Sequence, residues 1–98
     1  MAQTFTLSVW TVKTGQEEEF VRRWHELAEL GWQMGLSGSA KLLRDVDNPR
    51  VFVSFGPWQS LDKVGRWRSS PEFHDRISRL QEILDGFEPR TLDQIAES

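Results

Sequence analysis

The period at which apolar residues recur changes repeatedly along this chain, and the order of those changes restricts its fold more than any other feature. In residues 4–12, Phe5, Leu7 and Val9 alternate with the residues of the opposite face, which is the two-residue period of a β-strand. In residues 20–28, apolar side chains fall at i, i+4, i+7 and i+8, which places them on one face of a helix. Between these segments Gly15 breaks the strand, and consecutive glutamates then mark a helix N-terminus.

The middle of the chain has the pattern of a β-hairpin. We expect the helix to end between residues 31 and 35, and a strand to begin near Ser39. Residues 45–50 form a turn, because Asp and Asn side chains bond to nearby backbone and Pro49 fixes its own φ. Residues 51–55 are the clearest strand, and residues 56–58 are expected to end it.

The second helical region is predicted in two parts. Ser60 is the expected N-cap of the first part, and Ser70 that of the second, with Pro71 at its first helical position. The expected core stripes are Leu61, Val64 and Trp67 in the first part, and Phe73, Ile77, Leu80 and Leu84 in the second. Gly86 is a stop signal, and residues 90–95 form at best an edge strand because of the nearby Pro89.

The element order β-α-β-β-α-β predicts an α+β fold, the ferredoxin-like split βαβ sandwich, in which helices cover one face of an antiparallel sheet. A chain of 98 residues is expected to form a single domain over residues 1–98. The other sheet face carries Phe, Val and Leu with no helix to cover it, so it would expose more apolar surface than monomers usually do. We therefore expect a homodimer that packs through this sheet face.

Composition narrows the chemistry. The chain has five Trp and six Phe but no Cys, no Tyr and two His, which excludes thiolate and phenol chemistry. The two histidines lack the spacing of a metal site, so no metal is expected. A net charge of −3 without a basic stripe argues against nucleic acid. No apolar run has the length of a membrane span and no signal peptide is visible, so we expect a cytoplasmic protein that does not bind membranes.

Three segments resemble the antibiotic biosynthesis monooxygenase (ABM) domain family: residues 13–20, residues 51–60 (VFVSFGPWQS) and residues 67–73 (WRSSPEF). The similarity extends from about residue 5 to residue 87. It implies a dimeric α+β barrel and a cofactor-independent monooxygenase acting on an aromatic, polyketide or quinol-like small molecule, with no cofactor. The family also contains haem-degrading enzymes and members without an assigned reaction, so membership indicates fold better than function.

The resemblance also implies site residues. The antibiotic-oxidising members use an Asn and a Trp near the end of the third strand and a Tyr on the next helix. In this chain Trp58 matches that Trp, whereas Ser54 stands in place of the Asn and Val64 in place of the Tyr.

The haem-degrading members use an Asn, a Trp and a His. Trp67 matches the Trp, but Ser8 stands in place of the Asn and Ile77 in place of the His. The resemblance therefore supports haem degradation less than it supports oxidation of an antibiotic-like substrate. His74, one helical turn earlier, is a candidate to reach the same cavity. Trp10 shares a strand face with Ser8 and joins the expected pocket.

These comparisons make Trp67 and His74 the catalytic candidates. The substrate-binding candidates are Ser8, Trp10, Ser54, Trp58, Val64 and Ile77. Three of them have a plainer interpretation: Trp58 and Trp67 as packing residues, and His74 as a surface histidine. The arginines of the second helical region either steer an anionic substrate or form ordinary ion pairs.

Three functions therefore remain open: the oxygenase, a non-catalytic dimeric module that binds a small hydrophobic ligand, and a haem-binding protein. Direct oxygenation requires a substrate that becomes an electron-rich enolate or phenolate. The protein then supplies a dry aromatic pocket, a base and donors for the developing oxyanion.

Overall fold

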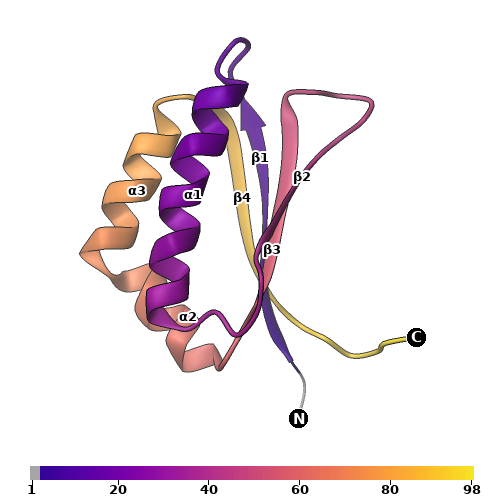
Figure 1. Ribbon diagram of the computed structural model, residues 1–98, viewed down its shortest axis with the longest axis vertical. Helices are drawn as coiled ribbons and strands as arrows, with labels where there is room; N and C mark the ends of the chain where they lie inside the picture. The colour runs from indigo at the N-terminus through magenta and orange to yellow at the C-terminus, as the bar shows by residue number, and fades with distance from the viewer. Residues whose placement is uncertain (1–2) are drawn as a thin grey trace.

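The computed structural model describes residues 3–98 and has the expected order of elements, with helices on one face of an antiparallel sheet (Figure 1). The elements are β1 (Thr4–Val12), α1 (Glu17–Met34), β2 (Lys41–Arg44), β3 (Val51–Trp58), α2 (Leu61–Ser69), α3 (Pro71–Gln81) and β4 (Leu84–Asp93). The four strands follow the order β2-β3-β1-β4, and every neighbouring pair is antiparallel. This is the α+β ferredoxin-like fold that the sequence predicts. No helix within residues 3–98 is long and apolar enough to cross a membrane.

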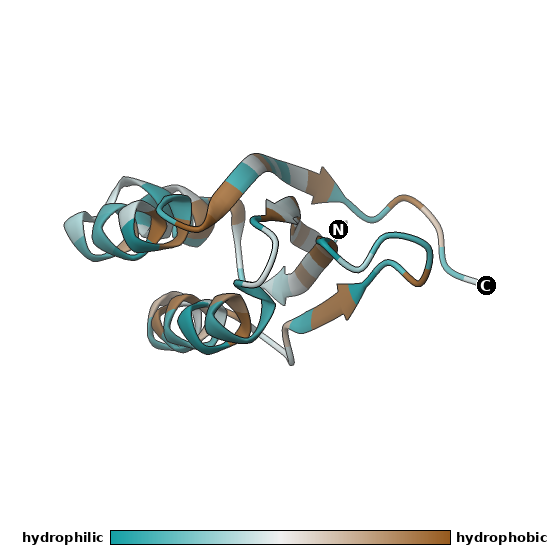
Figure 2. Ribbon diagram, turned by 90° about the horizontal axis from the view of Figure 1, so that it is seen from above, coloured by the Kyte–Doolittle hydropathy of each residue, from teal (hydrophilic) through white to brown (hydrophobic). Residues whose placement is uncertain are grey.

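The central strand β1 separates the two faces of the sheet. Trp10 and Val12 are buried on the face that the helices cover, and Phe5, Leu7 and Val9 lie half-buried on the opposite face. Figure 2 shows the helices on one side of the strands and none on the other. The alternation in the sequence therefore specifies which side chains enter the helix-covered core.

Helix α1 packs through the predicted stripe, with Phe20, Trp24 and Leu27 buried. It ends at Gly35, whose φ of 147° favours glycine and whose N–H donates to the Gly31 carbonyl at 2.9 Å. A side chain at position 35 would also approach within 2.8 Å of the Lys63 side chain. This glycine thus lets the chain turn sharply while α1 stays close to α2.

The hairpin differs from prediction at two boundaries. The strand β2 begins at Lys41 rather than near Ser39, and β3 continues through residues 56–58 to Trp58 instead of ending before them. Pro57 is tolerated because its carbonyl accepts from Ser37 N, away from β1, so its missing N–H removes no hydrogen bond to that strand.

Both predicted serine caps are present. Ser60 Oγ accepts from Lys63 N at 3.2 Å, and Ser70 Oγ accepts from Phe73 N at 3.1 Å. The sequence prediction for the end of α3 was wrong, since the helix stops at Gln81 and Leu84 is the first residue of β4. Leu84 is nevertheless buried, because a strand that pairs with β1 can direct it into the same core.

The last strand is longer than expected and forms one edge of the sheet. It spans ten residues and includes Pro89, flanked by the exposed Glu88 and Arg90. At the other edge, β2 has only four residues, among them the exposed Lys41 and Arg44. Both edges therefore carry features that hinder pairing with a further strand.

Candidate functional site

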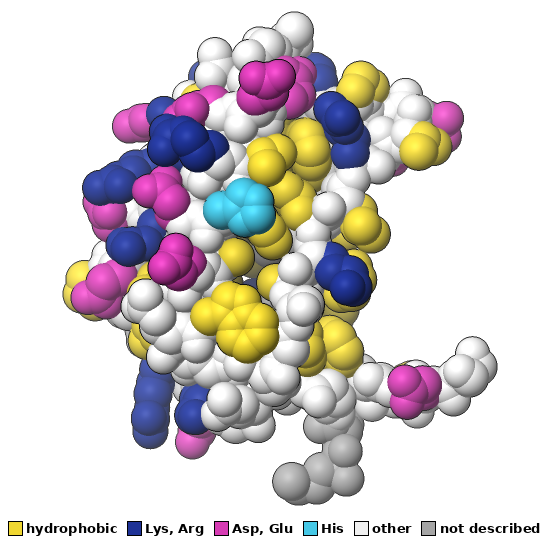
Figure 3. All heavy atoms as spheres, in the orientation of Figure 1, with side chains coloured by type: hydrophobic (Ala, Val, Ile, Leu, Met, Phe, Trp, Pro, Cys, Tyr) yellow, Lys and Arg dark blue, Asp and Glu magenta, His cyan; other side chains and the backbone are white. Residues whose placement is uncertain are grey.

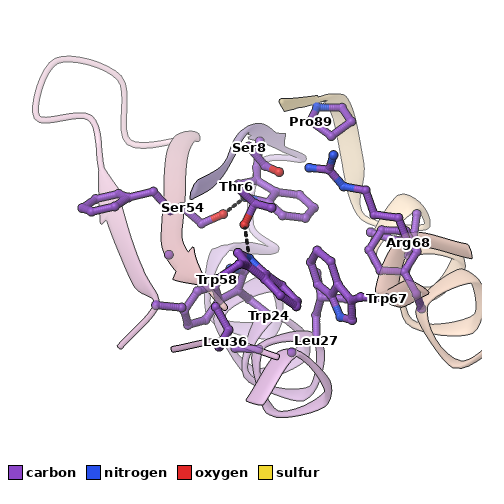
Figure 4. A pocket seen from close by; sticks show the side chains of 18 of the residues that line it. Thr6, Ser8, Trp24, Leu27, Leu36, Ser54, Trp58, Trp67, Arg68 and Pro89 are labelled. Carbon is purple, nitrogen blue, oxygen red and sulfur yellow. Dashed lines mark hydrogen bonds between the residues drawn. The ribbon is translucent and has the colours of Figure 1, made fainter. Parts of the chain in front are cut away.

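A pocket lies between the sheet and the helices. Strands β1 and β3 provide its hydroxyl-bearing floor, and the three helices provide mainly apolar walls (Figure 4). Its free volume is about 40 Å³. A cavity of roughly 10–15 Å³ holds a water molecule, whereas an engineered cavity of roughly 150 Å³ holds benzene. The pocket as it stands therefore has room for water, and an aromatic ligand requires side-chain movement.

Two buried tryptophans are fixed to the floor of this pocket by hydrogen bonds. Trp10 Nε1 donates to Ser54 Oγ at 2.9 Å, and Trp58 Nε1 donates to Thr6 Oγ1 at 2.9 Å. A hydroxyl that accepts a hydrogen bond still has its own proton to donate. Ser54 and Thr6 can therefore point a donor at a ligand while holding an indole ring in place.

Aromatic contacts build the walls. The ring centroids of Trp58 and Trp67 are 4.8 Å apart, and Phe73 meets Trp67 edge-on at 4.7 Å. On the side of β4, Phe87 stacks on Trp10 at 4.6 Å. Such a wall favours a flat, apolar ligand, because ring faces and edges contribute both buried area and orientation.

The pocket also contains polar atoms without partners. Within the described residues, Trp67 Nε1 and Arg68 Nε are buried and have no hydrogen-bond partner. The guanidinium of Arg68 extends from α2 to β4, where it donates to the Arg90 carbonyl at 2.9 Å and to Thr91 Oγ1. Burial lowers the pKa of Arg68 from its ordinary value. Buried donors without acceptors are uncommon and call for an explanation.

The structure brings six of the eight candidate residues to this pocket. Its lining includes Ser8, Trp10, Ser54, Trp58, Trp67 and Ile77. Val64 is buried but packs in the core without lining the pocket. His74 is exposed on α3 and does not line it either, because it lies off the face that carries Phe73 and Ile77. The expectation that His74 is catalytic is therefore wrong for this pocket.

Of the two interpretations that the sequence leaves open for the arginines of the second helical region, the ion pair does not apply to Arg68. No carboxylate lies within 4.0 Å of Arg68 in the described part of the chain. Thr6 also lines the pocket. The available signal was its two-residue spacing from Ser8 and Trp10, which places all three on one strand face.

The pocket does not fit haem. Ile77 stands on the wall where the resemblance would require an imidazole, and the nearby His74 is outside the pocket. Across residues 3–98, no group of three or more His, Cys, Asp and Glu side chains is arranged to hold a metal ion.

A shallower groove runs along the surface between α1 and β2. Its lining includes Val21, Trp24, His25, Ala40 and Leu42. Figure 3 shows hydrophobic side chains gathered in this hollow between the helix and the strands. Trp24 and Ala40 belong to both this groove and the inner pocket, so the two lie back to back.

Comparison with known proteins agrees with this architecture. The family model described as antibiotic biosynthesis monooxygenase (ABM) matches residues 6–78. SnoaB, a cofactor-independent oxygenase from Streptomyces nogalater, superposes with a TM-score of 0.86 at 18% identity, over 100% of this chain and 97% of SnoaB. A conserved protein from Methanosarcina mazei Go1 gives a TM-score of 0.81 at 18% identity, over 94% and 92% of the two chains. No curated protein sequence matches the chain.

Proposed function

Because this chain belongs to the antibiotic biosynthesis monooxygenase family, we propose that it is a cofactor-independent monooxygenase acting on an aromatic, polyketide or quinol-like small molecule. The observation that carries this proposal is the pocket itself, which combines aromatic walls with the hydroxyl groups of Thr6, Ser8 and Ser54. The likeness to SnoaB, described as a cofactor-independent oxygenase, supports it.

The chemistry requires a substrate that donates electrons to oxygen. An anthrone loses a proton to form its enolate, and the enolate passes an electron to O₂. Recombination forms a C–O bond in a hydroperoxide, and loss of water gives the quinone. The balance is anthrone plus O₂ to anthraquinone plus water, so the substrate supplies all the electrons.

The protein contributes shape, dryness and hydrogen bonds. The indoles of Trp58 and Trp67 hold a flat ring in place, and the free protons of the Thr6 and Ser54 hydroxyls face the oxygen on which negative charge accumulates. Donors placed for such charge accelerate the reaction most when water is excluded.

Oxygen uptake tests the proposal. With anthrone, we expect uptake well above the protein-free rate, one O₂ per anthrone and anthraquinone as product. Trp67→Phe should lower kcat/KM by about tenfold, because the smaller ring holds the flat substrate less firmly. His74→Ala is the matched control and should react like the wild type. Oxygen uptake equal to the protein-free rate with both anthrone and a hydroquinone would refute the proposal.

A non-catalytic ligand-binding module is the second candidate. It is favoured by the pocket lining, which within the described residues contains no carboxylate and no imidazole to accept a proton. Native mass spectrometry distinguishes the two functions: a binding module should retain a hydrophobic ligand stoichiometrically and leave anthrone unoxidised.

We further propose that two copies of the chain associate through the sheet face that lacks helices. Phe5, Leu7 and Val9 lie there in β1, and Val53 and Phe55 lie there in β3. Leu43 and Leu92 extend the same face and are 52% and 40% exposed. An apolar surface of this extent is typical of an interface rather than of a solvated face.

A further inference from the structure

Arg68 differs from the other arginines of the helical layer, which either form an ion pair or, like Arg66, are exposed and lie outside the pocket lining. Arg22 and Arg23 pair with Glu19, and Arg79 pairs with Asp75. Arg68 lines the pocket, is only partly exposed and has two neutral oxygens as its acceptors. A guanidinium has five N–H donors, so two acceptors leave most of its capacity unused.

A second unused donor belongs to the neighbouring residue. Trp67 Nε1 is buried without a partner, and its ring lines the same pocket. Arg76 also has a buried Nε without a partner, but Asp75 lies 3.9 Å from its guanidinium and it does not line the pocket. The combination of an orphan donor, an uncompensated positive charge and a pocket is therefore confined to Trp67 and Arg68 in the described residues.

No negative charge competes for this position. Apart from Arg68, the lining residues are uncharged. The charged neighbours on β4, Glu88 and Arg90, pair with Val9 and Leu7 and so lie on the opposite face of the sheet. On α3, Asp75 is engaged with Arg76 and Arg79. The pocket lining therefore carries a positive charge without a neighbouring negative one.

We propose that Arg68 binds the ionised oxygen of an aromatic substrate, so that the pocket selects the phenolate or enolate over the neutral compound. This inference rests on the proposed function in one respect, namely that an aromatic substrate enters this pocket. It explains how the reaction proceeds without a base in the lining. Stabilising the bound anion lowers the pKa of the substrate, and water takes the proton.

A chromogenic phenol tests this selection without any oxidation. The phenolate of 4-nitrophenol absorbs visible light and the phenol does not, so absorbance reports the pKa of the bound compound. We expect binding to the wild-type protein to lower that pKa by about one unit or more. Its methyl ether, 4-nitroanisole, has the same ring without an ionisable oxygen and measures the apolar contribution alone.

Variants separate charge from structure. Arg68→Met should abolish the pKa shift and weaken 4-nitrophenolate binding by about tenfold or more, with 4-nitroanisole affinity within about twofold. Arg68→Lys should restore part of the shift, because it retains the charge without the planar fork. Arg66→Met, on the same helix but outside the pocket lining, is the matched control and should behave like the wild type.

One variant addresses the alternative that Arg68 only tethers β4. Thr91→Val removes one hydrogen bond of that tether and keeps the charge, so the shift should persist. Loss of the shift in Thr91→Val as completely as in Arg68→Met would overturn the proposal, as would a shift that survives in Arg68→Met. Tighter binding of benzoate than of 4-nitrophenolate would overturn the assignment to a phenolate.

The two proposals fail separately. A pKa shift that depends on Arg68, without oxygen uptake on anthrone, would leave the anion site in place and refute the oxygenase. Oxygen uptake without any pKa shift of 4-nitrophenol would refute the anion site and leave the oxygenase in place.

Discussion

At the scale of single residues, two hydroxyl groups tie the pocket to the stability of the sheet. Ser54 and Thr6 each accept a hydrogen bond from a buried tryptophan of the neighbouring strand. The same oxygens are thus structural acceptors and candidate donors to a ligand.

We predict that Ser54→Ala destabilises the protein by about 1–3 kcal/mol, because it leaves the buried Trp10 N–H without an acceptor. Ser8→Ala is the control, since Ser8 lies on the same face of β1 and no hydrogen bond of its hydroxyl is found in the described residues; its effect should stay within about 0.5 kcal/mol. Urea unfolding measures both. Equal midpoints for the two variants would contradict the structural role of Ser54.

The residue scale is also where sequence reasoning reached least far. The alternation in β1 correctly placed Ser8 and Trp10 on one face, and the position of His74 off the helical stripe of Phe73 and Ile77 indicated a surface histidine, whereas its catalytic role came from the family resemblance alone. Whether Arg68 has a carboxylate partner depends on where α2 packs against β4, and these two elements are far apart in the sequence. Periodicity describes the faces of one element and contains no information on such a meeting.

At the scale of elements, the first turn of α1 shows how charge is arranged on this fold. Glu19 accepts from Arg22 Nε at 3.1 Å and from Arg23 Nε at 2.7 Å, and Arg23 also reaches Glu82 beyond α3 at 3.0 Å. These hydrogen bonds, that of Arg22 foremost, lower the pKa of Glu19 from 4.5 to about 2. Arg23 thus links Glu19 at the start of α1 to Glu82 at the end of α3.

The sign of the pH effect follows from that depression. The ionised Glu19 contributes its full stabilisation above pH 4.5, and the contribution is lost as the pH falls from there to about 2. We predict that Glu19→Gln lowers the urea midpoint at pH 7 and that the difference from the wild type vanishes near pH 2. Glu18→Gln, in the same helical turn but without an ion pair in the described residues, should show a smaller difference at pH 7. A Glu19→Gln difference that does not change with pH would refute the linkage.

Element boundaries were predictable where a local signal exists. Ser60, Ser70 and Gly35 act through their own hydroxyl or backbone freedom, so capping rules find them. The errors occurred at Pro57 and Leu84, where pairing with β1 decides the state of the chain. Proline usually ends a strand because it has no N–H to donate. Pro57 continues β3 because that N–H would point away from β1.

At the scale of the whole molecule, the face without helices is the surface through which we propose that two copies of the chain meet. Leu7 lies near its centre, paired with Phe55 on one side and Arg90 on the other. Sequence pattern alone predicts an interface here, because the alternation leaves apolar residues on a face that no helix reaches.

We predict that Leu7→Lys shifts the chain from dimer to monomer, because it places a charge in the middle of the apolar interface. Light scattering coupled to size-exclusion chromatography gives the mass directly. Val46→Lys, at a site that is 95% exposed in the hairpin turn, is the control and should stay dimeric. A monomeric wild-type protein would refute the interface.

The edges of the sheet decide what kind of assembly is open to this protein. Pro89 cannot donate to a neighbouring strand, and the charged residues beside it, like those of the short β2, oppose stacking of copies edge to edge. Strand addition at an edge can repeat without limit and leads toward fibrils. In a two-fold dimer, by contrast, both copies bury the same face and no such face remains free for a third copy. With its edges hindered and one face apolar, the chain is biased toward a closed pair and against open-ended polymers.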